Sequence, residues 1–560
     1  MLWRPARCPL LPARSNRRLR QRKHCLQKIR WSVEMFRIMG IAQRASADRR
    51  NLRREPGRSP GPPSLTNIKM MKRTLQIGFV IAALFIAGCK VGPNFKEPAA
   101  PNVSGYTVTQ LPAATSSTTG AISGESQRFV QGLDIPGQWW TLFHSQPLND
   151  LIQRALTNSP DLAAAQAALA TAHENVLAQR GAYYPSASAS FSASRQRTSS
   201  QIAPVPNENQ FYFSLFTPEV AVSYTPDVFG LNRRTVESLK AQESQARSAL
   251  DAADVTLSAN IVVAAIQEAS LHAQIDATRR LIAINNNMVQ ILREQFAKGA
   301  ATRVAVAQQE SQLAQAEAVL PPLLNQLAQN HDLLAALAGG FPDEDLKEKF
   351  ELESLQLPQE LPVSLPSQLV EQRPDVRQAE ENYHAACALV GVATAHRLPN
   401  INLSADAGTM ALTAGTIFTG GAGFWDIGAS VTQPIFEGGT LLHQQRAAKD
   451  TYIQAADQYR STVISAFQNV ADTLNALQHD ADILRAAATA ARAAKVSLDL
   501  TRRQLETGNA GYLDVLTAEQ TYQQAAIALI QAEANRYSDT AALFQALGGG
   551  WWNRTDLSEK

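Results

Sequence analysis

A seven-residue repeat of apolar side chains in the last quarter of the sequence most restricts the folds open to this chain. Val, Leu or Ala recurs at every seventh position from 463 to 505, and a second apolar column runs from 467 to 488, four positions out of phase. Steps of four and three residues are typical of a coiled-coil seam. The pattern stops at 507–511, where two glycines permit the chain to reverse. The sequence therefore predicts a long helix that ends in a tight hairpin turn.

The same design occurs 209 residues earlier. An apolar seam runs from 261 to 296, interrupted by Glu268, and leads to a second glycine-containing turn at 298–302. The helix that begins at Asn232 would have about 65 residues and a length of about 100 Å, at 1.5 Å per residue. Two copies of one long helical hairpin are therefore predicted.

The rest of the chain is divided around these two copies. The first repeat is expected at 137–340 and the second at 365–550. Within the first, short helices at 147–180 and 303–337 would together match the length of the long helix, although Pro321-Pro322 is expected to break or kink the latter. Five further parts are expected: a basic extension at 1–69, a signal peptide at 70–88, an extended linker at 89–136 that is rich in Pro, Ser, Thr and Gly, a connection at 341–364 and a tail at 551–560.

The positive charge of the chain is concentrated in its leader. Residues 1–88 hold 20 of the 52 Lys and Arg residues but 3 of the 49 Asp and Glu residues, so the remainder is acidic and is not expected to bind nucleic acid. Residues 70–88 have the basic start, apolar middle and small-residue end of a signal peptide. Because such a segment belongs at an N-terminus, we interpret 1–69 as upstream sequence translated from a start site chosen too early. A basic tail or an organellar transit segment is the alternative.

Four segments change from the helical period to strict alternation. Apolar and polar residues alternate at 185–195, 212–226, 399–409 and 424–434. Strands of this length with one apolar and one polar face fit a lipid-facing β-barrel, and a soluble four-stranded sheet packed on the helices is the alternative. A bilayer forbids open sheet edges, and four strands are too few to close a barrel. A membrane-spanning sheet would therefore be shared by several chains, with eight strands from two copies or twelve from three.

The sequence shows no catalytic or metal-binding motif. The only cysteines after the leader are Cys89 and Cys387, which do not form a spaced metal set. The histidines after the leader are scattered without paired spacing: His144, His173, His272, His331, His384, His396, His443 and His479. We therefore predict neither an enzyme nor a cofactor or metal site.

Several separated motifs occur in a fixed order along the chain. They are Trp-Trp at 139–140 followed by Leu-Asn-Asp-Leu at 148–151, Ser-Tyr-Thr-Pro-Asp-Val-Phe-Gly at 223–230, Arg-Pro-Asp-Val-Arg at 373–377, and Ala-Leu-Gly-Gly-Gly-Trp-Trp at 546–552. With them, residues 89–552 resemble the TolC-like outer-membrane factor family, in its lipoprotein branch of the OprM and NodT type. The resemblance implies an α+β membrane protein that forms a homotrimer, with a shared twelve-stranded β-barrel and a long periplasmic α-barrel.

The resemblance also implies a function. Such a protein would be the passive, gated outer-membrane duct of a tripartite efflux system for drugs and other small toxic molecules. Its partners would be a periplasmic adaptor of the membrane-fusion type, an inner-membrane pump, usually of the proton-driven RND type, and the lipid of the outer membrane. Two alternatives remain at this stage: the exit duct of a type I protein-secretion system, and a periplasmic coiled-coil scaffold or adaptor.

One expected modification site lies at the end of the signal peptide. The residues Ile-Ala-Gly-Cys at 86–89 resemble a bacterial lipobox, which implies that Cys89 becomes the first mature residue and carries acyl chains. An ordinary signal peptide with a chance cysteine is the alternative. Lys90 follows, where an aspartate would signal retention in the inner membrane. The resemblance therefore implies the outer membrane, with the helices extending into the periplasm.

The two glycine turns are the remaining candidate sites. By the same resemblance they would be the periplasmic tips where the adaptor docks, with these residues on them: Gly299, Thr302, Gly508, Ala510, Gly511 and Tyr512. Asp514 would form an inward acidic ring that narrows the pore, one carboxylate per chain, because the matching residue of the first copy is Ala305. The alternatives are that the turns are only structural and that Asp514 is an exposed residue favoured by the helix dipole.

Overall fold

The computed structural model describes residues 90–103, 105–108, 111–197, 212–343 and 347–554. All of them belong to one structural unit, 83–560. The predictions for 1–69 and 70–88, and the predicted lipidation of Cys89, lie outside the described residues.

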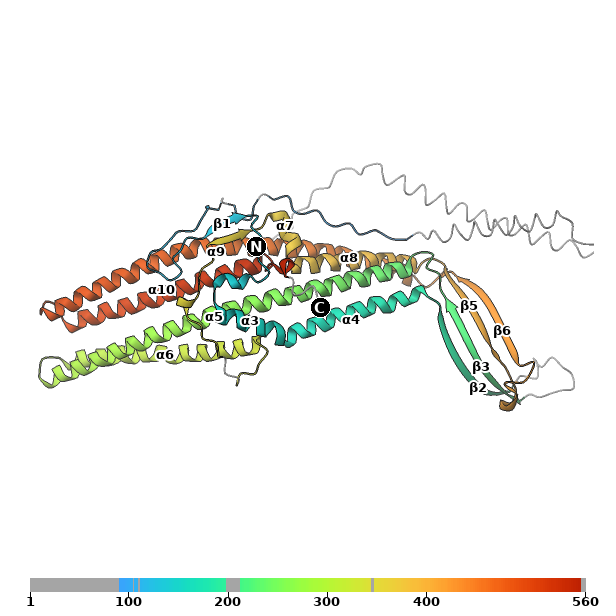
Figure 1. Cartoon of the computed structure of the whole chain (residues 1–560), viewed down its shortest axis with the longest axis horizontal. Helices are drawn as coiled ribbons and strands as arrows, with labels where there is room; N and C mark the ends of the chain where they lie inside the picture. The colour runs from blue at the N-terminus through green and yellow to red at the C-terminus, as the bar shows by residue number, and fades with distance from the viewer. Residues whose placement is uncertain (1–89, 104, 109–110, 198–211, 344–346, 555–560) are drawn as a thin grey trace, which may run out of the picture. The chain divides into compact units, whose positions relative to one another are not determined.

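Two helical hairpins of equal dimensions dominate the structure (Figure 1). The first consists of α5 (Leu231–Ala297, 67 residues) and α6 (Arg303–Leu337, 35 residues). The second consists of α9 (Thr440–Glu506, 67 residues) and α10 (Tyr512–Ala546, 35 residues), so its bounds are those of the first shifted by 209 positions. Six heptad positions of α9 are buried, because they face the neighbouring helices: Val463, Val470, Leu477, Leu484, Ala491 and Leu498.

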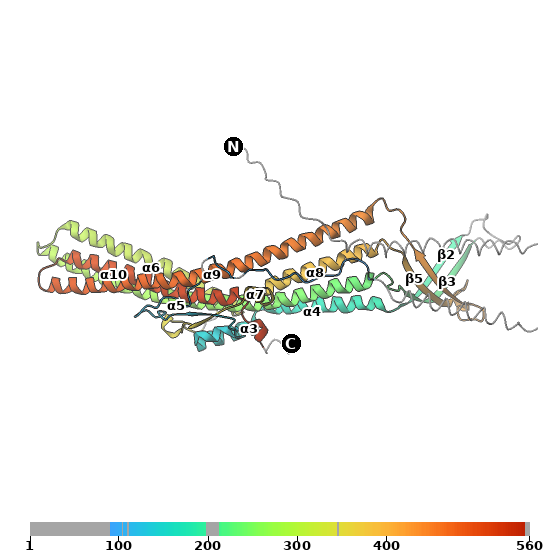
Figure 2. The same ribbon diagram turned by 90° about the horizontal axis from the view of Figure 1, so that it is seen from above.

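Shorter helices fill the length that α6 and α10 leave uncovered. α4 (Pro160–Arg180) packs on α5, and α8 (Pro374–Ala395) packs on both α5 and α9. Figures 1 and 2 show each short helix beside the strand-proximal part of its long partner, with α6 and α10 beside the distal part. The remaining elements are α3 (Gln146–Asn158), α7 (Pro366–Gln372) and the 3-10 turns η1 (Trp139–Phe143), η2 (Gly181–Tyr183), η3 (Leu352–Ser354), η4 (Ala414–Thr416) and η5 (Trp551–Asn553).

Two local expectations about helix breaks were wrong. The single helix predicted at 147–180 is divided into α3 and α4 at Ser159, which is extended (φ −62°, ψ 120°) because the residue before a proline is disfavoured in the helical region. Its Oγ accepts a hydrogen bond from the Leu162 N–H and caps α4. Conversely, α6 continues through Pro321-Pro322. Both prolines are exposed, as are residues 317 and 318, so the carbonyls without an N–H partner lie where water can reach them.

The main apolar core lies where α3, α7 and η1 meet the middle of the long helices. Trp139 is completely buried and stacks on Phe544 of α10, with ring centroids 5.3 Å apart. A two-stranded parallel sheet covers this level, in which β1 (Arg128–Gln131) pairs with β4 (Glu360–Val363). The two strands are more than 200 residues apart in sequence, so this contact joins the N-terminal segment to the connection between the hairpins.

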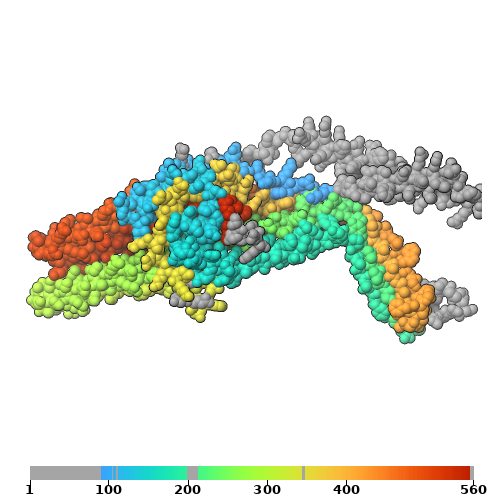
Figure 3. Space-filling view, viewed as in Figure 1, coloured from blue at the N-terminus to red at the C-terminus, as the bar shows by residue number. Residues whose placement is uncertain are grey.

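The N-terminal segment 90–131, called the strap below, lies along the helices in Figure 3. The expected linker is thus extended but bound. Two fully buried arginines hold its backbone: Arg234 of α5 donates to the Val91 carbonyl at 2.9 Å, and Arg536 of α10 donates to the Ser123 carbonyl at 2.6 Å. A buried guanidinium needs acceptors for its donors, and the strap supplies them.

Four strands form an antiparallel sheet beyond the ends of the helices. They are β2 (Ser186–Arg197), β3 (Tyr212–Tyr224), β5 (Asn400–Thr409) and β6 (Gly423–Thr432), in the order β2-β3-β5-β6. The register places Ala189, Val220, Ala407 and Trp425 in one row across the sheet, and Ser186, Ser223, Ser404 and Gly428 in another. Because successive side chains point to opposite faces, one face is apolar and the other polar.

The most apolar part of α5 also satisfies a length and composition test for a membrane-spanning helix, with a mean hydropathy of 1.6. However, 56% of that stretch is buried against other parts of the chain. Along its length α5 packs against α4, α6, α8 and α10, as a core helix does.

Candidate functional site at the hairpin ends

Both hairpin turns are built from the same hydrogen bonds. Gly299 and Gly508 are in the left-handed region, with φ of 77° and 76°. The Ala300 N–H donates to the Gln295 carbonyl, and the Asn509 N–H donates to the Gln504 carbonyl, each at 2.8 Å. This is the Schellman ending of a helix, which favours glycine because other residues are strained at positive φ. The predicted role of these two glycines as turn residues follows from this geometry.

The helices that leave the two turns are capped in different ways. Thr302 Oγ1 accepts a hydrogen bond from the Ala305 N–H at 3.2 Å and caps α6. Gly511, at the matching place before α10, has no side chain to do this. Instead Asp514 reaches back, and its Oδ2 accepts a hydrogen bond from the Gly511 N–H at 2.8 Å. A complete capping box has two side-chain-to-backbone hydrogen bonds, one made by the side chain of the N-cap residue and one by the side chain three positions later. The first turn has only the former, made by Thr302, and the second turn has only the latter, made by Asp514.

The predicted tip residues are all exposed or half-buried. Gly299, Thr302, Gly508, Gly511 and Asp514 are exposed, whereas Ala510 and Tyr512 are half-buried. Asp514 therefore caps α10 within its own chain. Its carboxylate is also exposed, so it is accessible to a neighbouring chain. A carboxylate in the first turn is favoured by the helix dipole as well.

A small apolar cluster joins the two hairpins just behind the turns. Met288 and Leu292 of α5 and Val306 of α6 pack in one buried cluster with Leu498 of α9 and Val515 and Leu516 of α10. Tyr512 packs against this cluster from the edge. Burial of apolar surface therefore holds the two turns together.

Next to the cluster is a groove of about 620 Å³ between α5, α6 and α10. Its lining includes the leucines Leu292, Leu513 and Leu516 and the glutamines Gln308, Gln312, Gln520 and Gln524. Ala305, the counterpart of Asp514, also lines this groove. The site can thus offer apolar contacts flanked by uncharged donors and acceptors, but among the described residues it offers no nucleophile and base in the arrangement of a catalytic site.

Sequence reasoning missed a pair of matching ion pairs near the turns. Arg293 of α5 binds Glu310 of α6 at 2.6 Å, and Arg502 of α9 binds Glu519 of α10 at 2.7 Å. The two pairs are again 209 positions apart, and this coincidence of Arg and Glu was visible in the sequence. They differ in burial: 44% of the Glu310 side chain is exposed, against 4% of the Glu519 side chain.

We expect this difference in burial to decide the effect of removing each arginine. Arg502→Ala leaves the buried Glu519 carboxylate without its cation and should destabilise the second tip by about 1–3 kcal/mol. Arg293→Ala, the matched control, removes an exposed pair and should cost at most about 1 kcal/mol. Hydrogen exchange of the backbone amides near each turn measures both effects. Equal loss of protection at the two tips would contradict the expectation.

The described residues include no group of three or more His, Cys, Asp or Glu side chains that could hold a metal ion. Cys387 is buried in α8, and its Sγ lies 3.8 Å from the Pro93 carbonyl of the strap. His173 and His384 contact carboxylates, Glu243 at 2.8 Å for the former and Glu381 at 3.4 Å for the latter. Contact with Glu381, opposed by burial and aided by Glu237, raises the pKa of His384 above its ordinary value.

Comparison with known proteins gives a consistent result. The family model described as "Outer membrane efflux protein" matches residues 151–340 and 365–549, more than half of the chain. The antibiotic efflux pump outer membrane protein ArpC of Pseudomonas putida is 27% identical over 483 residues, which cover 86% of this chain and 96% of ArpC. The pyoverdine export outer membrane protein OpmQ of Pseudomonas aeruginosa is 30% identical over 434 residues, which cover 76% of this chain and 90% of OpmQ.

Solved structures show the same fold. The CmeC outer membrane channel of Campylobacter jejuni superposes with a TM-score of 0.74 over 84% of this chain and 97% of its own, at 23% identity. The outer membrane protein VceC of Vibrio cholerae superposes with a TM-score of 0.68 over 75% of this chain and 100% of its own, at 27% identity. Together with the family model and the two relatives, these likenesses confirm the resemblance of the sequence motifs: the chain belongs to the outer membrane efflux protein family.

Proposed function

We propose that this protein is the outer-membrane duct of a tripartite efflux system, and that three copies build it. The observation that carries the proposal is the sheet: it has one apolar face, one polar face, and unpaired edges at β2 and β6 within the described chain. Edges cannot stay open in a bilayer, because their backbone groups would find no partner there. Three copies would pair these edges and close a barrel of twelve strands.

The helices support the same assembly. Large apolar side chains remain exposed on α9 in the single chain, although its heptad seam is buried: Ile453, Ile464, Ile483, Val496 and Leu500. Exposed apolar residues along a helix favour burial against further helices. In a trimer the two hairpins of each chain, which we interpret as two repeats, would form a continuous helical wall around a pore that extends into the periplasm.

Cargo and partners follow from the family and not from a site in this chain. The named relatives export an antibiotic and pyoverdine, so we propose small molecules as cargo. A passive duct needs an energy source, and an inner-membrane pump, linked by a periplasmic adaptor, would supply it. The groove and the turns with Gly299, Thr302, Gly508, Ala510, Gly511 and Tyr512 are the proposed docking surface for that adaptor.

Lipidation of Cys89 belongs to the same proposal. Its neighbour Lys90 contacts Glu237 at the start of α5, and the Val91 N–H donates to the Phe229 carbonyl at 3.3 Å. Phe229 lies between the end of β3 and the start of α5. The residue that follows the proposed acyl anchor is therefore bound where the strands meet the helices, which is the level at which a lipid anchor would enter the membrane.

Deletion of the gene tests the function. We expect the deletion strain to become sensitive to several small toxic compounds, to the same extent as a strain that lacks the inner-membrane pump, and to recover on complementation. Loss of one secreted protein without drug sensitivity would favour the type I secretion duct. Recovery of the protein in aqueous extracts without detergent would favour the periplasmic scaffold. A panel with no change in sensitivity would contradict the proposal.

We further propose that Asp514 narrows the pore at the second turn. Asp514→Ala should increase cation leak through the purified channel in planar bilayers, and Ala305→Ser at the matching place should not. Since Asp514 also caps α10 through the Gly511 N–H, Asp514→Asn separates the two roles: it keeps a cap acceptor and removes the charge. Leak in both Asp514 variants would identify the charge as the cause. Conductance equal to the wild type in both would remove Asp514 from the gate.

A further inference from the structure

Two acidic side chains meet in the interior of the second hairpin. Asp480 of α9 is 8% exposed, and no backbone N–H, hydroxyl, amide or cationic donor of the described residues reaches its Oδ2. The carboxyl group of Asp539 on α10 lies within hydrogen-bonding reach of it. Two carboxylate ions only accept hydrogen bonds, so this contact requires that one of the two groups carries a proton.

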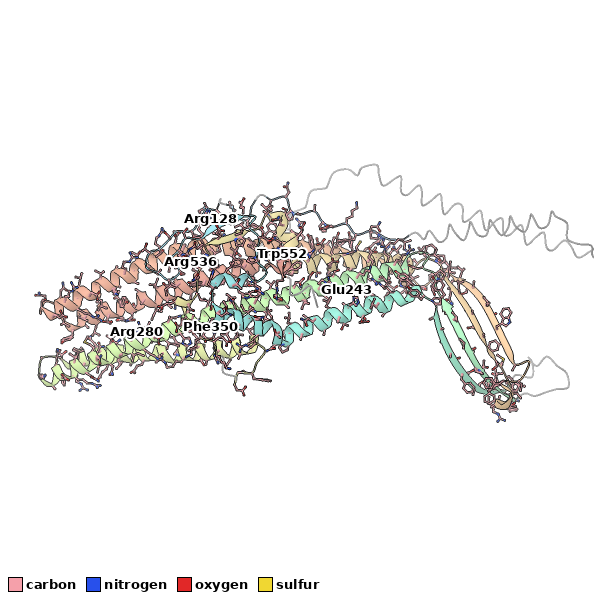
Figure 4. All side chains as sticks on the ribbon, viewed as in Figure 1. Arg128, Glu243, Arg280, Phe350, Arg536 and Trp552 are labelled. Atoms are coloured by element: carbon pink, nitrogen blue, oxygen red, sulfur yellow. The ribbon has the colours of Figure 1, made fainter. Side chains whose placement is uncertain are left out.

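The cation closest in sequence is already engaged elsewhere. Arg536 lies one turn before Asp539 on α10, in the part of the helix labelled in Figure 4. Its guanidinium donates to the Ser123 and Glu125 carbonyls of the strap, at 2.6 and 2.5 Å, and to Thr115 Oγ1 at 3.0 Å. It weakly favours the charged form of Asp480 but makes no hydrogen bond to it among those of the described residues.

The charged groups that act on Asp480 can be named for each neighbouring element. From α10 they are Asp539 and Arg536. From the strap, Glu125 acts indirectly, through Arg536. On α9 itself the nearby Asp482 points to the strap, where it accepts a hydrogen bond from Ser116 Oγ at 3.0 Å. Burial, then the hydrogen bond to Asp539 and its charge, raise the pKa of Asp480 well above its ordinary value.

The first hairpin shows that the fold does not need this pair. At the places 209 positions earlier, α5 has Leu271, which is 1% exposed, and α6 has Asn330, whose Nδ2 donates to the Ala264 carbonyl at 2.9 Å. An apolar side chain and a satisfied amide therefore fill the same position without charge. Of the two hairpins, the second has the buried acid pair at this position. The pair destabilises that hairpin whenever both groups are ionised.

We propose that Asp480 and Asp539 form a proton-operated latch between α9 and α10, which holds the helices together while the pair shares a proton and loosens them when it is lost. The strap crosses both helices at this level, since Ser116 contacts Asp482 of α9 and the Ile122 N–H donates to Glu533 of α10 at 2.8 Å. Loosening would thus act on the hairpin that carries the 507–511 turn. The latch does not rest on the proposed export function.

The direction of the pH effect follows from linkage. The pKa of Asp480 is raised in the folded protein, so its contribution to stability is full below the pKa of the unfolded chain and is lost as pH rises through the raised pKa of the folded state. For one linked proton, the equilibrium constant for local opening rises by at most about tenfold per pH unit. The latch is therefore closed in acid and loosened in alkali.

Hydrogen exchange of the detergent-purified full chain between pH 6 and 9 tests the latch, after correction for the intrinsic pH dependence of exchange. Protection of the amides at 476–484 and 535–543 should fall with rising pH in the wild type. It should become independent of pH in Asp480→Asn and in Asp539→Asn, which imitates Asn330. Asp482→Asn, the same change two residues away on an exposed side chain, should keep the wild-type dependence.

Infrared spectroscopy provides a second readout that does not depend on folding stability. At pH 6.5 the C=O stretching band of protonated carboxyl groups should be weaker in Asp480→Asn and in Asp539→Asn than in the wild type, by the contribution of one carboxyl group. Part of the band should remain in all three proteins, because burial raises the pKa of Asp251 to about 6. If Asp480→Asn fails to fold, Asp539→Asn decides. A wild-type pH dependence retained in the variants, or a protonated carboxyl band of equal intensity in all three proteins, would overturn the latch. Drug sensitivity of the deletion strain is independent of either result.

Discussion

Phe191→Arg should abolish insertion of the protein into the outer membrane. Phe191 is in the middle of β2, 64% exposed, on the apolar face where it is paired with Pro218. An arginine at mid-depth of a lipid-facing strand costs about 2–4 kcal/mol, and a trimer incurs this cost three times. We expect heat-modifiable trimers to disappear from outer-membrane fractions, as measured by gel electrophoresis of heated and unheated samples.

Ser192→Arg is the matched control for this prediction. Ser192 is the next residue of the same strand, at nearly the same depth, but it points to the polar face. A side chain that faces a water-filled pore can carry a charge, so trimers should persist and only conductance should change. If instead Ser192→Arg abolished trimer formation and Phe191→Arg did not, the apolar face would point inward. That result would contradict the proposed barrel.

Arg536→Met should release the strap from the helices. The side chain is completely buried and donates to backbone carbonyls of Ser123 and Glu125, which would remain buried without donors. Because several charge-assisted hydrogen bonds would be lost, we expect the free energy of unfolding to fall by about 3–4 kcal/mol, which is in the upper range for single substitutions. The thermal unfolding midpoint should fall, and trypsin should cleave after Arg128 of β1 before the helices unfold.

Arg485→Ala serves as the control for the strap. Arg485 is on α9, where 58% of its side chain is exposed, and it contacts Asp482 at 2.9 Å. Exposed pairs of this kind contribute at most about 1 kcal/mol, so unfolding and cleavage should match the wild type. If Arg536→Met resembled Arg485→Ala in both measurements, the strap would be held by its other contacts, such as those of Arg234.

The parts of the fold with a regular period were predictable from the sequence. The seam residue Leu477 is 0% exposed and packs in the main core, and the alternation at 424–434 corresponds to β6, where Trp425 is exposed and paired with Ala407. These patterns can be recognised in the sequence because the residues on one face of a helix or strand recur at a fixed interval along the chain. The division at Ser159 was also local, and the Ser-Pro pair was a signal that the prediction overlooked.

The candidate site was only partly predictable. The turns around Gly299 and Gly508 follow from glycine and its positive φ, which is a local property. The capping bond of Asp514 required the backbone conformation of Gly511. The groove beside Leu516 required the mutual placement of α5, α6 and α10, which no local pattern contains.

By itself the sequence determined the two hairpins, their glycine turns and the two-faced strands, because each depends on residues close together along the chain. Only the tertiary structure decided which polar groups are buried together. Arg536 meets Ser123 across 413 positions, and Asp480 meets Asp539 between two helices. Isolated polar side chains form no periodic pattern in the sequence. Their protonation state and the free energy of burying them depend on neighbouring groups, which only long-range packing brings together.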